Sequence, residues 1–299
     1  MGHYYSFSEY LRSRFNEKVR RISLDPGFPC PNREASFGQG GCSFCDRSAF
    51  SGTVLKGASV REQLSAGIEM ALSKGIKKHI AYFQDSTPTN APAEELKKTF
   101  DVIREFPSVV ALSVSTRPDC VDDEKLDVIA GYLKEYDVWM EYGLQTANNN
   151  TLSLINRGHT FEQAKEAVKR TAERGIRSAF HIILGLPGET AEDMMNTARE
   201  ISALPIWGIK LHVLHILKKT PLEELYRRGE IKLFTMEDYA RAACDFLEHI
   251  PGKIVILRLV SDAKKDNLIA PVWINDKLKA IDRIEKEFIL RNTRQGSLA

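Results

Sequence analysis

The sequence predicts an α/β fold with a largely parallel sheet, and three observations support this prediction. Short apolar runs recur with centres near residues 81, 112, 141, 180 and 211, and one segment with helical periodicity lies in each gap. The length of 299 residues and the hydrophobic content of 43% are typical of one large α/β domain or two ordinary ones. A repeated strand–helix order gives a parallel sheet, because each helix returns the chain to the start of the next strand.

Local patterns place the individual elements. Ser59 and Glu62 have the S-x-x-E form of a capping box, so a helix begins there, and Gly75 ends it. Thr160 and Gln163 begin a later helix in the same way. Strands are expected at 19–24, 78–84, 109–115, 138–144, 176–184, within 206–217 and at 254–259, and helices begin near Pro92, Thr190 and Thr235.

The first six strands form six βα units, which either close partly into a barrel or lie open as a doubly wound sheet. Periodicity does not distinguish these two arrangements, and in both of them ligands bind at the carboxyl ends of the strands. We expect residues 1–220 to form the core. Residues 221–299 are expected to form a C-terminal helical extension packed on it, with a basic helix at 275–291.

Charge is nearly balanced overall, with 42 basic and 40 acidic side chains, but it is unevenly distributed. Residues 1–29 carry five basic and three acidic side chains, and residues 251–299 carry ten and six. This excess is either chance scatter or a contact surface for a polyanion. The chain has no run of eighteen apolar residues and no apolar signal segment at its start, so we expect a cytoplasmic protein without a membrane span.

The cysteines are the first feature that indicates chemistry. Five are present, an odd number without a secretory context, so a disulfide framework is not expected. Cys30, Cys42 and Cys45 form a C-x11-C-x2-C pattern in a loop rich in Gly and Pro. Three thiolates suit a four-iron cluster that keeps one iron open, whereas structural zinc prefers four closed ligands. The spacing alone leaves an iron–sulfur cluster, zinc and structural or redox cysteines as alternatives.

Three cysteines after the first strand of a six-unit βα fold resemble the radical SAM superfamily. The commonest spacing there is C-x3-C-x2-C, so the first gap is longer in this chain, but Phe44 supplies the usual aromatic before the last cysteine. Further similar segments are Gly143-Leu-Gln145-Thr with Arg157-Gly-His159-Thr, the stretch from His181 to Thr190, and Ser115-Thr-Arg117-Pro-Asp119. Together they cover most of the chain.

The resemblance is to one bacterial radical SAM family of tentatively assigned role. GFPCPNR, the GGCSFC end of the cysteine segment and the late stretch from Leu268 to Trp273 are typical of it. The family is related to the catalytic subunit of Elongator and to oxygen-independent coproporphyrinogen oxidase. The resemblance implies a partial (βα)6 barrel of radical SAM type.

The resemblance also implies the cofactors. Cys30, Cys42 and Cys45 would bind three irons of a [4Fe–4S] cluster, and the fourth iron would bind the amino and carboxylate groups of S-adenosylmethionine (SAM). Reductive cleavage of SAM would yield methionine and a 5′-deoxyadenosyl radical, with a flavodoxin- or ferredoxin-type protein as the one-electron donor. The residues implied in SAM binding are Phe44, Ser115, Gln145, Arg157, Gly185 and Gly188, and Gln84 replaces the glycine-rich motif of the second strand.

Substrate residues are less well determined. The candidates lie in strands or at strand ends and are Tyr82, Arg117, Glu141, His181, His212 and His215. A histidine in a strand is more often structural than catalytic. Cys120 and Cys244 are interpreted as small apolar residues, with a role as thiol donors as the alternative.

Three hypotheses for function follow. The first is a radical SAM enzyme that modifies tRNA, at a wobble uridine by its kinship to Elongator. The second is a radical SAM enzyme for a small molecule such as a tetrapyrrole or a cofactor precursor. The third is a zinc-stabilised RNA-binding protein without catalysis.

Overall fold

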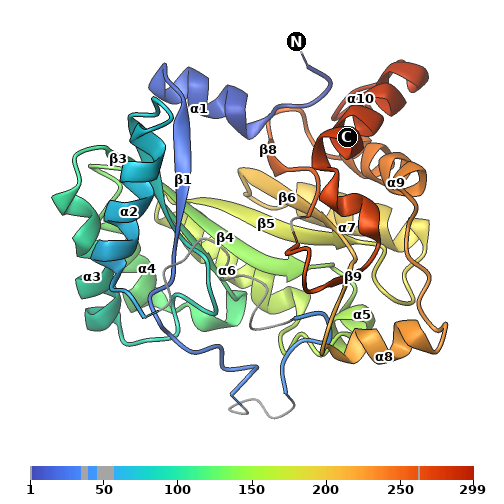
Figure 1. Ribbon diagram of the computed structural model, residues 1–299, viewed down its shortest axis with the longest axis horizontal. Helices are drawn as coiled ribbons and strands as arrows, with labels where there is room; N and C mark the ends of the chain where they lie inside the picture. Colours follow the sequence, from blue (N-terminus) through green and yellow to red (C-terminus); the bar gives the residue numbers. More distant parts are fainter. Residues whose placement is uncertain (1, 35–39, 46–56, 262) are drawn as a thin grey trace.

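The computed structural model describes residues 2–34, 40–45, 57–261 and 263–299, and its centre is one parallel sheet (Figure 1). Seven strands lie in the order β1-β2-β3-β4-β5-β6-β8, with β1 and β8 at the edges. Their bounds are β1 Val19–Leu24, β2 Lys78–Phe83, β3 Val109–Thr116, β4 Asp137–Gln145, β5 Arg177–Leu184, β6 Gly208–Val213 and β8 Val255–Arg258. The sheet curls into a half-barrel.

This arrangement confirms the predicted partial barrel. All six βα strands form at their expected places, and every neighbouring pair is parallel. The seventh strand, β8, comes from the expected strand at 254–259 and pairs in parallel with β6. The structure therefore extends the six-stranded expectation by one strand from the C-terminal part of the chain.

Ten helices occur in the described residues, and most of them cover the outer face of the sheet (Figure 1). The capping boxes at Ser59, Thr160 and Thr190 are formed as their sequences indicate. The bounds are α1 Phe7–Phe15, α2 Val60–Leu72, α3 Ala93–Asp101, α4 Asp123–Ala130, α5 Asn149–Leu154, α6 Phe161–Glu173, α7 Ala191–Ser202, α8 Pro221–Arg227, α9 Met236–Glu248 and α10 Lys277–Arg291.

The two faces of the sheet bury different side chains because strand residues alternate in direction. The outer face, with residues such as Phe83 and Met140, joins the large core under the helices. On the inner face, near the starts of the strands, Trp139 and its neighbours form a separate apolar cluster with Tyr10 of α1. The rings of Tyr10 and Trp139 lie 5.3 Å apart in an edge arrangement, which closes this end of the half-barrel.

The two ends of the chain meet at the same closed end (Figure 1). The backbone amide of Tyr5 donates to Gln295 at 2.9 Å, and the ring of His3 stacks on Phe288. After residue 220 the chain also supplies β9 (Leu268–Ala270), which pairs antiparallel with β7 (Ile216–Leu217). The domain boundary at 220 stays a prediction. No helix of the described residues has the length and apolar character that a membrane crossing requires.

Candidate functional site

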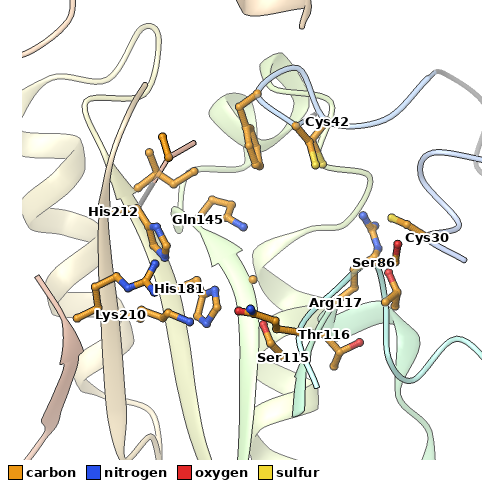
Figure 2. A pocket seen from close by; sticks show the side chains of 18 of the residues that line it. Cys30, Cys42, Ser86, Ser115, Thr116, Arg117, Gln145, His181, Lys210 and His212 are labelled. Atoms are coloured by element: carbon orange, nitrogen blue, oxygen red, sulfur yellow. The ribbon is translucent and has the colours of Figure 1, made fainter. Parts of the chain in front are cut away.

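A cavity of about 540 Å³ opens at the carboxyl ends of the strands (Figure 2). Its volume is typical of a small-molecule or cofactor site. Predicted residues from distant parts of the sequence line it together: Cys30, Cys42, Phe44, Cys45, Tyr82, Gln84, Ser115, Arg117, Gln145, Arg157, His181, His212 and His215. The fold therefore brings the cysteine loop and the strand-end motifs to one place.

Nitrogen donors surround the cysteine sulfurs at the mouth of this cavity. The Asn32 amide donates to Sγ of Cys42 at 3.3 Å, and Arg33 donates to Sγ of Cys45 at 2.7 Å. Arg157 approaches Sγ of Cys42 at 3.5 Å from another segment. Such donors stabilise thiolates and tune the clusters they hold. The mouth is thus chemically suited to anionic sulfur ligands.

The donor set fits a cluster better than a single ion. Among the described residues, no three His, Cys, Asp or Glu side chains converge on a position for one metal ion. A tetrahedral zinc site needs such convergence. In an iron–sulfur cluster each thiolate binds its own iron, so the sulfurs lie around the cluster and not around one atom. Within the described part of the chain three cysteines line this cavity, which fits a cluster that keeps one iron open.

Arg157 is a buried residue and not a surface cation, with only 6% of its surface exposed. Its Nε and Nη2 donate to the carbonyl of Gly143 at 3.0 and 2.5 Å. A Cβ atom at position 143 would lie 2.8 Å from Nη2, so a larger residue here would require the guanidinium to shift. Arg117 supports the same segment, donating to the carbonyl of Arg157 at 3.0 Å while it pairs with Asp119.

The other predicted SAM residues divide into two groups. Phe44, Ser115 and Gln145 line the cavity, and Gln145 holds a φ of +84°, a strained conformation typical of functional sites. Gly185 and Gly188 do not line it, although both have positive φ. A Cβ at Gly185 would lie 2.9 Å from the Phe234 ring, so close packing explains this glycine. Contacts of the two glycines with adenosine stay a prediction.

A charged layer forms the floor of the cavity, one step above the apolar cluster around Trp139. At its centre the fully buried carboxylate of Glu141 accepts from Arg21 Nη2 at 2.9 Å and from Lys210 Nζ at 3.1 Å. Tyr82 and Ser113 also donate to it, at 3.1 and 2.8 Å. We call Arg21, Tyr82, Glu141, His181, Lys210, His212 and Arg258 the charged floor; all but Glu141 line the cavity.

Burial and neighbouring charges shift the pKa values of the charged floor. Burial lowers the pKa of Lys210 to about 7, although Glu141 opposes this change. Burial and the charge of Lys210 lower the pKa of His181 to about 3, and burial and Arg258 hold the pKa of His212 well below its usual range. Burial opposes ionisation of Glu141, but Arg21 and Lys210 outweigh it and keep the pKa of Glu141 well below its usual range.

The structure also places His181, Cys120 and Cys244, three candidates from the sequence analysis. His181 Nε2 lies 2.9 Å from Glu141, so this histidine belongs to the charged floor. Cys120 and Cys244 are buried and do not line the cavity, and burial raises the pKa of both thiols to about 12. Both therefore remain protonated thiols. Cys244 belongs to the large apolar core, as interpreted from the sequence, whereas Cys120 adjoins the ion pair of Arg117 and Asp119.

Comparison with known families agrees with this geometry. The radical SAM superfamily matches residues 36–201, more than half of the chain, and the radical SAM C-terminal domain matches residues 206–289. The chain belongs to the radical SAM superfamily. It is accordingly an enzyme whose cofactors are a [4Fe–4S] cluster and SAM, which excludes a non-catalytic zinc protein.

Relatives of this radical SAM enzyme match it over nearly its full length. Protein YtqA of Bacillus subtilis is 37% identical over 98% of this chain and 92% of its own. Protein YhcC of Escherichia coli is 34% identical over 97% of this chain and 94% of its own. A tRNA uridine(34) acetyltransferase of Methanocaldococcus jannaschii is 30% identical, over 43% of this chain and 24% of its own.

Solved structures show the same fold. The archaeal Methanocaldococcus infernus Elp3, with an N-terminal deletion, superposes with a TM-score of 0.69 at 18% identity. The match covers 93% of this radical SAM enzyme and 64% of that chain, so this enzyme spans less than two thirds of the Elp3 structure.

The sequence analysis did not single out Arg21, Lys210 and Arg258. Each is a cation in a short strand whose other side chains are mostly apolar: VRRISL, GIKLHV and VILR. A buried cation costs free energy unless it has a partner or a ligand, so a lone cation in an apolar strand is a usable signal. Their meeting around one cavity was not visible, because they come from strands far apart in the sequence.

Proposed function

We propose that this enzyme cleaves SAM reductively at a [4Fe–4S] cluster held by Cys30, Cys42 and Cys45. When bound and reduced, the cluster supplies the electron that converts SAM into methionine and a 5′-deoxyadenosyl radical. The observation that supports this proposal is that the three cysteines and four of the six predicted SAM residues line one cavity. A ferredoxin- or flavodoxin-type donor delivers the electron, in the cytoplasm where thiols stay reduced.

The roles of the protein residues follow from their surroundings. Arg157 presents a planar cation beside Cys42, where a bidentate contact with the SAM carboxylate is favourable. Gln145 and Ser115 offer an amide and a hydroxyl for the amino group or the ribose of SAM, and Phe44 offers an aromatic ring that would pack beside its adenine. Gly185 and Gly188 shape the turn that follows β5.

For the substrate we propose tRNA, modified at a wobble uridine. The support is similarity to enzymes named tRNA uridine(34) acetyltransferase, over 43% of the chain. The two basic flanks of the sequence support tRNA binding less than expected. Most of their length lies at the closed end of the half-barrel, away from the cysteine loop (Figure 1). However, Arg21, Arg258 and Lys264 from these flanks do line the cavity.

A small molecule is the second candidate substrate. The observation that favours it is the cavity itself, whose floor is a compact layer of buried charges and not an extended surface. An oxygen-independent coproporphyrinogen-III oxidase-like protein, HemZ of Bacillus subtilis, is 28% identical over 64% of this chain.

The first experiment is an assay for SAM cleavage. The protein is reconstituted anaerobically with iron and sulfide, and SAM and dithionite are added. We expect 5′-deoxyadenosine by mass spectrometry. A formed, reducible cluster that yields none, with or without bulk tRNA, contradicts the proposed chemistry.

The second experiment tests tRNA as substrate. Binding of bulk tRNA is titrated at several salt concentrations, and we expect affinity to fall steeply with salt because phosphate contacts release counterions. Absence of binding at low salt, with SAM cleavage intact, would reject tRNA and leave the small molecule.

A further inference from the structure

The charged floor carries more positive than negative groups. Among the described residues of the floor, Arg21 and Lys210 bring two basic side chains against one carboxylate, that of Glu141. Lys210 is 2% exposed and Glu141 is fully buried. Burial of an excess charge is costly, because protein surroundings solvate it less well than water. An anion placed among these groups would offset that cost.

The carboxylate of Glu141 is already saturated. Its Oε1 accepts from Ser113 and Arg21, and its Oε2 accepts from Tyr82, His181 and Lys210. Glu141 therefore holds the cations in place but has little capacity for further neutralisation. Arg258 also lines the cavity, and its charge contributes to lowering the pKa of both Lys210 and His212.

Two nitrogen atoms of the charged floor lack a hydrogen-bond partner. Nε of Arg21 and Nε2 of His212 are buried and make no hydrogen bond within the described parts of the chain. Both residues line the cavity. A buried polar atom without a partner is rare in proteins and costs roughly 1–3 kcal/mol. Such atoms beside a cavity indicate that a ligand completes the site.

The mouth and the floor are separate parts of the cavity. Figure 2 shows Cys30 and Cys42 on one side, Lys210, His181 and His212 on the other, and Gln145 and Ser115 between them. The carboxylate of SAM belongs to the mouth, beside the cysteines and Arg157. The positive floor consequently faces whatever lies beyond SAM in the cavity, which is the place of the substrate.

We propose that the charged floor is a binding site for an oxyanion, a carboxylate or phosphate group carried by the substrate. The proposal rests on the proposed function in one respect: SAM occupies the mouth. Arginine and lysine make strong charge-assisted hydrogen bonds with such groups, and the guanidinium fork matches their geometry. The substrate part that enters the cavity is therefore acidic, whether it is a small acid or a phosphorylated group.

The test is a binding titration of the reconstituted enzyme with SAM saturating, so that the mouth is filled. Sulfate serves as the tetrahedral probe and succinate as the carboxylate probe, each against chloride at equal ionic strength in a calorimeter. We expect one site per chain for at least one probe. The tighter probe indicates whether the substrate carries a phosphate or a carboxylate.

Three variants identify the site. Arg258→Met removes a charge with little change in volume and should weaken binding about tenfold or more, as loss of a charge-assisted hydrogen bond does. Glu141→Gln should also weaken binding, because Glu141 holds Arg21 and Lys210 in place and opposes the lowering of the Lys210 pKa. Lys253→Gln removes an exposed cation near the start of β8 and should change nothing. A purely structural role of the floor predicts no loss of affinity in Arg258→Met.

Two results would overturn the proposal. One is absence of binding of either probe to wild-type enzyme that still cleaves SAM. The other is equal affinity of wild type and Arg258→Met, with circular dichroism showing both folded. Failure of the SAM-cleavage assay concerns the proposed function instead, and the two failures are thus distinguishable.

Discussion

The mouth and the charged floor of the cavity are built in different ways. The mouth depends on one loop, in which two residues separate Cys42 from Cys45 and eleven separate Cys30 from Cys42. The floor takes one or two side chains from each of six strands, and Arg21 and Arg258 come from opposite edges of the sheet. A local site can be recognised by its spacing, whereas a distributed site exists only after the strands have paired.

The difference also separates two chemical tasks. The mouth needs ligands of the same chemical type in any enzyme that uses these cofactors, because the cofactors determine which protein groups can bind them. In our proposal the charged floor faces the substrate, and its charges select that substrate. Changes at the mouth should therefore affect cofactor chemistry, and changes at the floor should affect substrate binding alone.

The largest expected effect is at the mouth. Cys42→Ala removes one thiolate ligand and should abolish cluster assembly and SAM cleavage, measured as iron content, absorbance near 400 nm and 5′-deoxyadenosine. Cys244→Ala is the matched control, because this thiol is buried away from the cavity. Retained iron and full cleavage in Cys42→Ala would remove this residue from the ligand set.

The second effect concerns SAM binding. Arg157→Ala should weaken SAM affinity by about tenfold or more, since a charge-assisted contact is lost, while the cluster still assembles. Calorimetry with SAM and iron analysis measure the two parts separately. Arg157→Lys keeps the charge but loses the fork, so an intermediate affinity is expected. Unchanged SAM affinity in both variants means that Arg157 serves only Gly143 and Cys42.

The third effect is a pH dependence of anion binding, which is expected at the charged floor and not at the mouth. Lys210, with its pKa near 7, is charged below this pH and neutral above it. Sulfate affinity, measured with SAM saturating, should fall as pH rises from 6 to 8.5. Loss of the whole charge of Lys210 should weaken sulfate affinity by about tenfold.

The other titratable members of the charged floor do not titrate in this window. The lowered pKa values of Glu141, His181 and His212 keep the first ionised and the other two neutral, and burial raises the pKa of Tyr82 far above it. Arg21 and Arg258 keep their charge. Lys210→Arg should therefore flatten the pH dependence. An equal slope in this variant and wild type would assign the titration elsewhere.

The smallest effect lies beneath the floor. The Tyr10 hydroxyl donates to both carboxylate oxygens of the buried Asp137, at 3.0 and 2.8 Å. Tyr10→Phe should lower the free energy of unfolding by about 1 kcal/mol, the usual value of one buried hydrogen bond. Urea denaturation measures this change. Cofactor content should not change, and a loss of cluster in this variant would show that floor and mouth are coupled.

The sequence by itself determined the sheet strands, because each is a short apolar run with helical segments between. It also indicated the cysteine loop and the radical SAM kinship, since their patterns are local. It did not predict α1, although Ser6 and Glu9 form a capping box there. That helix is held by Trp139 and Asp137, which are distant in sequence.

Only the tertiary structure decided what the strand residues do together. Strand alternation places Lys210 and His212 on one face of the sheet. It does not show which strands are neighbours or which carboxylate pairs with Lys210. Likewise, the sequence predicts Arg157 as a SAM-binding residue, but its contacts with Gly143 and Cys42 were not visible before the structure. The physical reason is that charge and hydrogen bonding act over a few ångströms, and folding alone sets which residues come that close.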